Sequence, residues 1–273
     1  MKNEVVLFFT ITVFTFGSCQ KQKSENGFGT TVFSEINNEL KQAPDLKICF
    51  SATDLNGVPD QPTCEVNLYA YPLKSLNQFA ELTVNGKTSP RNNTPYGGIF
   101  STNKPRGSLD TREDLSGLFG KDVDISFKSQ ELGNFNGTLT TTLPIHALVN
   151  DKEVTTETMT TEVSKSNDLK ITWNKDESNK LPVVFHLRHE KAFPDIKNGE
   201  QPFDPNIFLK KEGVDNGILI IKSSELQKFP EGDYINISIF RSSYKILTTS
   251  LGKKALLYTL NQSGTPHLLA LKK

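Results

Sequence analysis

The sequence has no excess of charge of either sign and few signs of helix. Its 273 residues include 31 Lys and Arg and 31 Asp and Glu, so the formal net charge is zero. A basic surface for nucleic acid and an acidic surface for cations are therefore not expected. Apolar residues rarely recur at helical spacing, and Ser223–Phe229 favours a helix of only one or two turns.

The sequence also lacks an apolar run long enough to cross a bilayer. The apolar segment Val5–Phe16 has twelve residues, whereas a membrane-spanning helix needs about 20. An apolar core of about 7–15 residues followed by small residues is typical of a signal peptide. We therefore expect residues 1–18 to be a signal peptide and the rest of the chain to be exported.

The apolar segment ends in Phe16-Gly17-Ser18-Cys19, and polar residues follow at once. This run resembles the lipobox of bacterial lipoproteins, in which the signal peptide is cut before a cysteine that carries lipid. The resemblance implies a lipid on Cys19, a lipidated tether over 19–43 and attachment to a bacterial membrane outside the cytoplasm. The outer membrane is the membrane we expect. The alternative is an ordinary secretory signal that is cut elsewhere, with Cys19 incidental.

Two further cysteines follow, Cys49 and Cys64, and a cysteine pair in an exported chain favours a disulfide. The strand pattern complicates this pairing. Cys49 alternates with the apolar residues of its expected strand, whereas Cys64 lies on the apolar face of its own. A hairpin with Cys49 opposite Cys64 would set Ile48 against Glu65, so the apolar faces would disagree. A bulge, strands in different sheets, or the absence of a disulfide would each resolve the conflict.

Short runs of alternating apolar and polar residues recur from Leu46 onward, separated by Gly, Pro, Asn and Asp. In one of them Val123, Ile125 and Phe127 face one way and polar residues face the other, as in a half-buried antiparallel strand. Many short strands with little helix predict an all-β fold made of β-sandwiches. The expected strands are Leu46–Ser51, Glu65–Tyr71, Val123–Lys128, Thr138–Leu143, Leu169–Trp173, Val183–Arg188, Gly217–Lys222, Tyr234–Phe240, Ala255–Leu260 and His267–Leu271.

A polar stretch near the middle of the chain suggests two domains. Residues 151–167 are rich in Thr and contain no apolar pair. We expect an N-terminal β-sandwich over 44–150 and a C-terminal β-sandwich over 168–273, both Ig-like or transthyretin-like. The stretch between them is either a linker or a solvent-facing edge strand, since Thr is a good strand former.

Residues 46–71 contain a strand, the run Asp54-Leu-Asn-Gly-Val-Pro59 and a second strand with Val66-Asn-Leu-Tyr69. This order resembles the start of carboxypeptidase-regulatory-like and transthyretin-like domains. In that family the first two strands lie in opposite sheets, which would explain the parity of the two cysteines. Such domains are mostly structural or binding modules, so the resemblance implies no catalysis.

The C-terminal part is similar to a sandwich found in lipoproteins of the Bacteroidota that carry no assigned activity. The similarity covers residues 169–273 and rests on three pieces of sequence. They are Leu169–Asn174, Asp215–Gly217 and Leu226–Gly232.

No pattern typical of a catalytic site stands out, since there is neither a Gly-x-Ser-x-Gly elbow nor a phosphate-binding loop. His186 and His189 come nearest to a metal pattern, but on a strand their spacing of three sets them on opposite faces. Asp54, Asn56 and Asp60 resemble part of a calcium loop, although a hairpin turn explains them better. We expect no catalytic residue, no metal and no cofactor.

The principal hypothesis is a non-catalytic, lipid-anchored envelope protein that acts as a binding or structural module. Its expected partners are the membrane, through Cys19, and envelope proteins or a glycan, but not nucleic acid. One alternative is a carbohydrate-binding lipoprotein with exposed, coplanar aromatic rings that stack on sugars. The other is a metal-dependent hydrolase, which requires His186 and His189 to converge. The aromatic candidates are Trp173, Tyr69, Tyr71, Tyr96 and Tyr234.

Overall fold

The computed structural model describes residues 44–53, 63–70, 80–88, 91–94, 97–100, 115–153, 160–191, 204, 206–263 and 267–272. Almost all regular structure in these ranges is β, so the predicted all-β class is confirmed. The expected helical segment forms one turn, α2 (Ser223–Leu226), and a 3-10 turn, η1, covers Leu115–Leu118. The strands are β1 (Leu46–Thr53), β2 (Thr63–Ala70), β3 (Glu81–Val84), β4 (Lys87–Thr88), β5 (Arg91–Thr94), β6 (Gly97–Phe100), β7 (Asp122–Lys128), β8 (Phe135–Thr140), β9 (Ala147–Val149), β10 (Lys152–Glu153), β11 (Thr160–Ser164), β12 (Leu169–Trp173), β13 (Val183–Glu190), β14 (Phe208–Gly213), β15 (Ile218–Ile221), β16 (Tyr234–Arg241), β17 (Tyr244–Thr248), β18 (Lys254–Gln262) and β19 (His267–Lys272).

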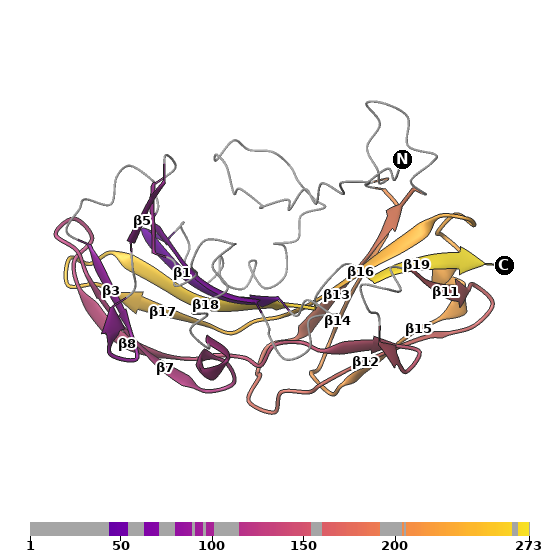
Figure 1. Cartoon of the computed structure of the whole chain (residues 1–273), viewed down its shortest axis with the longest axis horizontal. Helices are drawn as coiled ribbons and strands as arrows, with labels where there is room; N and C mark the ends of the chain where they lie inside the picture. The colour runs from indigo at the N-terminus through magenta and orange to yellow at the C-terminus, as the bar shows by residue number, and fades with distance from the viewer. Residues whose placement is uncertain are drawn as a thin grey trace, which may run out of the picture.

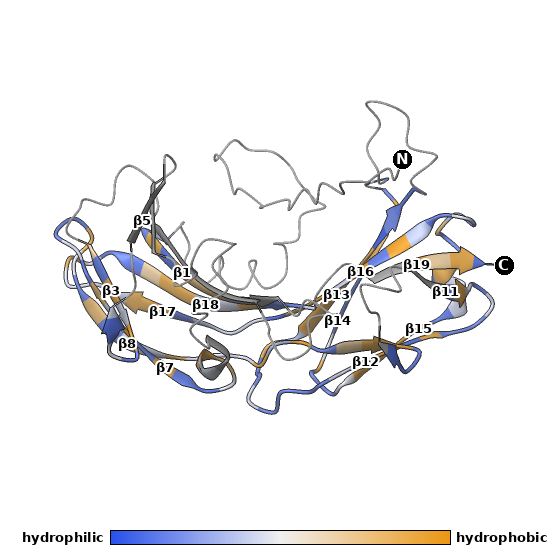
Figure 2. Cartoon of the chain, viewed as in Figure 1, coloured by the Kyte–Doolittle hydropathy of each residue, from blue (hydrophilic) through white to orange (hydrophobic). Residues whose placement is uncertain are grey.

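The strands form where the sequence alternates between apolar and polar residues. In β7, Val123, Ile125 and Phe127 are buried, whereas Asp124 and Lys128 are exposed. Successive side chains of a strand point to opposite faces, so this alternation gives one face to the core and the other to water. Figure 2 shows the same division across the molecule, with apolar residues along the strands and hydrophilic residues in most turns.

One long hairpin runs through the whole molecule (Figure 1). Its first arm is β16 followed by β17, and its second arm is β18 followed by β19. Arg241 pairs with Asn261 and Tyr244 with Tyr258, so β17 and the end of β16 keep one register along β18. Further along, β16 pairs with β19. Both ends of the elongated molecule are therefore built on the same two arms.

The first lobe is built around the turn end of this hairpin and contains β1–β8, β17 and β18. There β1 lies between β2 and β18, antiparallel to β2 and parallel to β18. A second sheet in the order β4-β3-β7-β8 packs against these strands. The core between the two sheets contains Leu46, Ile48 and Phe50 from β1 and Ala255 and Leu257 from β18, together with the buried face of β7.

The tip of the long hairpin is fastened to the second sheet of this lobe. The Ser250 N–H donates to the Asn134 carbonyl at 2.8 Å, and the Asn134 N–H donates to Ser250 Oγ at 2.9 Å. Gly133 adopts a φ of +82°, and a Cβ there would lie 2.8 Å from the Leu251 nitrogen. Only glycine tolerates both the backbone angle and this close approach.

The second lobe is built around the open end of the hairpin. β16 lies between β13 and β19, and β14 and β11 extend the sheet on either side. A smaller sheet in the order β10-β9-β12-β15 packs against it. The shared core includes Ile171, Phe185, Ile237 and Leu269, and the rings of Trp173 and Phe185 lie 4.9 Å apart.

The two lobes are not separated at residues 151–167, where the sequence suggested a domain boundary. β17 and β18 fall in the segment expected to form the C-terminal sandwich, yet they pair with each other beside β1 and build the first lobe. β9 falls in the expected N-terminal sandwich, yet Ala147 and Val149 lie in the second core. For β17 and β18 the reason is the long hairpin, which carries late residues into the first lobe. β11 lies at the end of the large sheet, the position that the edge-strand alternative requires of residues 160–164.

Candidate functional site

Some of the residues singled out in the sequence lie outside the described ranges. They include the signal peptide 1–18, Cys19 and the rest of the tether 19–43. They also include Asp54, Asn56, Asp60, Tyr71 and Tyr96. The interpretations placed on these residues stay predictions.

Cys49 and Cys64 lie on neighbouring strands but not opposite each other. Cys49 pairs with Asn67, and Cys64 pairs with Ala52, three ladder positions away. At about 3.3 Å per residue this offset is about 10 Å, whereas a disulfide joins Cα atoms at most about 7 Å apart. The register argues against the proposed bond. It also corrects the expectation of opposite sheets, because β1 and β2 pair directly and Ile48 meets Leu68 without a bulge.

His186 and His189 lie on opposite faces of β13. His189 is buried, with Nε2 2.8 Å from Asp233 Oδ2, and its Nδ1 accepts the Asp204 N–H at 3.3 Å. His186 is half-buried on the other face and meets the Phe240 ring edge-on, with centroids 5.6 Å apart. The two imidazoles do not converge on a shared ligand.

Trp173 is not available as a sugar platform, because its side chain is buried in the second lobe. Its ring packs on Phe185, and its indole N–H donates to Asp215 Oδ1 at 2.7 Å. Tyr234 is half-buried on β16, and Tyr69 lies in β2, opposite Lys47 in the ladder. The Trp173 contact leads instead to a buried network of charged and polar groups between the lobes.

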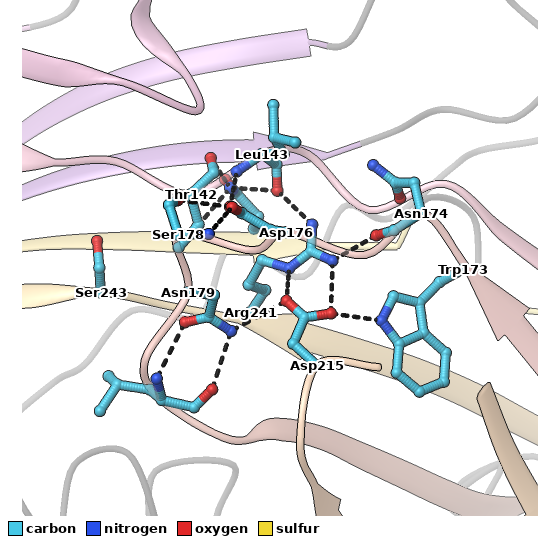
Figure 3. A network of polar contacts seen from close by, with 12 residues as sticks. Thr142, Leu143, Trp173, Asn174, Asp176, Ser178, Asn179, Asp215, Arg241 and Ser243 are labelled. Atoms are coloured by element: carbon cyan, nitrogen blue, oxygen red, sulfur yellow. Dashed lines mark hydrogen bonds and ion pairs between the residues drawn. The ribbon is translucent and has the colours of Figure 1, made fainter. Parts of the chain in front are cut away.

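The centre of this network is an ion pair between Arg241 and Asp215 (Figure 3). Arg241 is fully buried at the end of β16, and Asp215 lies in the turn between β14 and β15. Arg241 Nε donates to Asp215 Oδ2 at 2.7 Å, and its second nitrogen donates to Oδ1 at 2.9 Å. Asn179 Nδ2 adds a bond to Oδ2 at 3.1 Å. This bidentate geometry is the strongest arrangement available to an Arg–carboxylate pair.

The remaining Arg241 nitrogen binds backbone carbonyls of neighbouring segments. It donates to Leu143 O at 2.9 Å, in the link from β8 to β9, while the nitrogen bound to Asp215 Oδ1 also reaches Asn174 O after β12. The side chain therefore joins four stretches of chain: the end of β16, the β8–β9 link, the β12–β13 link and the β14–β15 turn.

A second group of buried contacts continues the network toward the first lobe. Asn261 Nδ2 on β18 donates to the carbonyls of Thr142 at 2.7 Å and Leu143 at 3.0 Å. The hydroxyls of Thr142 and Thr259 lie 3.1 Å apart. The extended link between β8 and β9 is thus bonded to both arms of the long hairpin.

Asp176 adds a second buried carboxylate beside this link. Burial disfavours its charged form, but hydrogen bonds from Ser178 and the Leu143 N–H, together with the nearby charge of Arg241, outweigh burial and lower the pKa of Asp176. Asp176 is therefore held ionised as a fixed acceptor for the Leu143 backbone.

The network holds chain segments together and leaves little for a substrate. A carboxylate has about four acceptor positions, and Asp215 receives four hydrogen bonds from Trp173, Asn179 and Arg241. Its contacts therefore fit a joint between the lobes rather than a reacting group.

A shallow hollow of about 500 Å³ lies on the solvent face of β3, β7 and β8. Thr138 Oγ1 donates to Asp124 Oδ1 across it at 2.8 Å. The hollow offers hydroxyl, amide and carboxylate groups to a polar ligand, and no aromatic ring lines it. Its lining residues are Thr83, Gly86, Asp124, Ile125, Ser126, Asn136, Gly137 and Thr138.

The sequence patterns pointed to neither Arg241 nor Asp215. Asp215-Asn-Gly217 is typical of a turn before a strand, and Arg241 directly follows the expected strand Tyr234–Phe240. The one available signal is the position of Arg241, since a charge that directly follows an apolar strand can lie inside the fold and then needs a partner. Nothing in the sequence identifies that partner as Asp215.

Across the described ranges, no three His, Cys, Asp or Glu side chains gather as a metal site would require. Within the same ranges, no helix has the length and apolarity to cross a membrane. Comparison with protein-family models finds no family that matches the chain, and comparison with curated proteins finds no relative.

Proposed function

We propose that this protein is a non-catalytic, lipid-anchored envelope protein that acts outside the cytoplasm as a binding or structural module. The observation that carries the proposal is the apolar N-terminal segment ending in Phe16-Gly17-Ser18-Cys19. A diacylated cysteine gives stable membrane attachment, because each buried CH₂ contributes about 0.8 kcal/mol.

The junction between the lobes supports a structural or binding role. Its charged groups, Arg241 and Asp215, are bonded to each other and to the backbone. The long hairpin and this network hold the two lobes in a fixed arrangement, which suits a module that presents surfaces to partners. The outer membrane remains the membrane we propose.

The two alternatives draw less support from the described residues. Glycan capture loses stacking on Trp173, which is buried, and would depend instead on polar contacts in the hollow of β3, β7 and β8. A metal-dependent hydrolase would need His186 and His189 to converge, and they lie on opposite faces of β13.

The experiment replaces the anchoring residue, Cys19→Ala, and uses Cys49→Ala as a matched control. The unchanged chain and the control should incorporate labelled fatty acid and sediment with membranes. The Cys19→Ala chain should incorporate no label and lose its stable attachment. Labelling of the Cys19→Ala chain, or a mature N-terminus elsewhere than at Cys19, would contradict the anchor.

A further inference from the structure

Among the edge strands described in the second lobe, β15 differs from the others because it carries no charge. Its sequence is Ile218-Leu219-Ile220-Ile221, and in the described ranges it pairs only with β12. Edge strands are normally protected from pairing with other chains by charged residues, prolines or bulges. Here the other edge strands of the second lobe follow that rule: β14 contains Lys210, Lys211 and Glu212, β10 is Lys152–Glu153, and β11 contains Glu162.

The outward side chains of β15 form an exposed apolar patch. Ile218 and Ile220 are 44% and 37% exposed, and Val214 in the preceding turn is 80% exposed. Leu219 and Ile221, at the alternate positions, pack toward the core of the second lobe. The patch therefore lies on the solvent face of the small sheet, directly beside its open edge.

Within the described ranges, no second strand pairs with this edge of β15. Trp173 N donates to Gly217 O at 3.0 Å, so the odd-numbered residues of β15 bond to β12, and Ile218 and Ile220 direct their main-chain groups outward. The Ile218 N–H is held by Asn216 Oδ1 at 3.2 Å. In the described part of the chain, no hydrogen bond uses the Ile220 N–H or the Ile218 carbonyl.

We propose that β15 is the docking edge for a second copy of this chain, which pairs with it antiparallel about a two-fold axis at Leu219. In this register each Ile220 N–H donates to the Ile218 carbonyl of the other copy. Each Ile218 side chain also meets Ile220 of the other copy on the same face. The two small sheets then form one continuous sheet across the dimer.

A second copy fits this edge better than a foreign peptide for two reasons. Pairing about a two-fold axis closes both open edges at once and stops at the dimer, whereas an added peptide would expose a new edge of its own. The chain also has zero net charge, so two copies do not repel each other at long range.

A two-fold axis at Leu219 fits the open main-chain groups better than an axis at the adjacent residue, Ile220. Centring the axis on Ile220 would set Ile218 opposite Lys222, whose N–H already donates to Glu225 Oε2 at 3.0 Å in the cap of α2. Centring it on Leu219 uses the open groups, and displacing the exposed Asn216 contact would release the Ile218 N–H for a second pair of bonds. This proposal is independent of lipid attachment.

The first test co-expresses two differently tagged copies of the full chain and measures how much of one is isolated with the other. The unchanged copies should co-isolate, and Ile220→Lys in both should reduce recovery at least about tenfold. Leu251→Lys is the matched control, since Leu251 is 56% exposed in the turn between β17 and β18, and it should leave recovery unchanged. Failure of the unchanged copies to co-isolate, or full recovery with Ile220→Lys, would overturn the proposal.

The second test leaves Ile218 and Ile220 unchanged and determines which residues of the two β15 strands lie opposite each other. Residues on the axis of an antiparallel pair lie about 4.5–5.5 Å apart, so Leu219→Cys should give a disulfide-linked dimer under mild oxidation. Leu251→Cys should give none. Absence of the Leu219→Cys cross-link would refute self-pairing. In the co-isolation test, so would recovery of a different protein that depends on Ile220 in place of the second copy.

Discussion

Arg241 is a charged side chain that is fully buried without being isolated. Each of its three nitrogens donates to an acceptor, and Asp215 supplies the opposite charge. Burying two charges is costly, and a buried pair compensates only when the geometry and the further hydrogen bonds are good. Surface pairs such as Lys175–Glu177, whose side chains are 53% and 80% exposed, contribute little by comparison.

The surroundings of His186 make the stability of the fold depend on pH. Burial, followed by the charges of Lys210 and Arg188, lowers its pKa from 6.5 to about 4, and Glu212 opposes the shift. The unfolded chain therefore binds a proton at this histidine between pH 6.5 and about 4, and the folded chain does not. Stability attributable to His186 is present above pH 6.5 and is lost as the pH falls through this window.

We predict that His186→Gln removes this part of the pH dependence. Urea unfolding at pH 7 and pH 5 should show a larger loss of unfolding free energy for the unchanged protein than for the variant. Most carboxylates stay ionised at pH 5 in both proteins, so the difference isolates the histidine. Equal losses in the two proteins would contradict the lowered pKa.

At the scale of strands, the register between β1 and β2 determines whether the two cysteines can form a disulfide. Ile48 opposite Leu68 brings together residues of like hydropathy, and this register sets Cys49 opposite Asn67. A one-residue slip would reverse the face of every side chain in the strand. The apolar pattern, and not the cysteines, therefore sets the pairing.

We predict that Cys49 and Cys64 are both thiols in the protein as isolated. After unfolding without reductant, both should react with a thiol reagent, and Cys64→Ser should react with one fewer equivalent. If the two cysteines formed a disulfide, Cys64→Ser would instead show one more reactive thiol than the unchanged protein, because removing Cys64 would release Cys49. The measurement is a thiol titration of the two proteins side by side.

The strands were largely predictable and their partners were not. Alternation in Val123, Ile125 and Phe127 specifies a half-buried strand from local sequence alone. The pairing of β1 with β18 joins residues from opposite ends of the chain, and no local pattern encodes it. The same limit applies to Arg241 and Asp215, which meet because the turn before β15 lies beside the end of β16.

At the scale of the whole molecule, the long hairpin makes the two lobes parts of one unit. β16 and β18 pair through Phe240 and Arg241, and the network around Asp215 lies beside this pairing. The link between β8 and β9 is bonded to the same region through Thr142 and Leu143. Loss of order in one lobe would expose strands on which the other depends.

We predict one cooperative thermal transition, with calorimetric and van't Hoff enthalpies equal. Asp215→Ala should lower the free energy of unfolding by about 3–5 kcal/mol, because it leaves Arg241 buried without its counter-charge. Glu177→Ala, which removes a carboxylate from an exposed pair, should leave stability nearly unchanged. Two separate transitions in the unchanged protein, or a negligible effect of Asp215→Ala, would contradict the prediction that the two lobes unfold as one cooperative unit.

The pairing of β1 with β18 also sets the order of events when the protein is made. Asp45 accepts a hydrogen bond from the backbone of Lys254, 209 positions later in the chain. Domains usually fold N-terminal first during synthesis, but β1 cannot pair with β18 until nearly the whole chain has left the ribosome. Contacts of such long range also form slowly. The nascent chain therefore stays unfolded for longer than one with local pairing, which would suit the export that we propose, because a narrow export channel can thread only an unfolded chain.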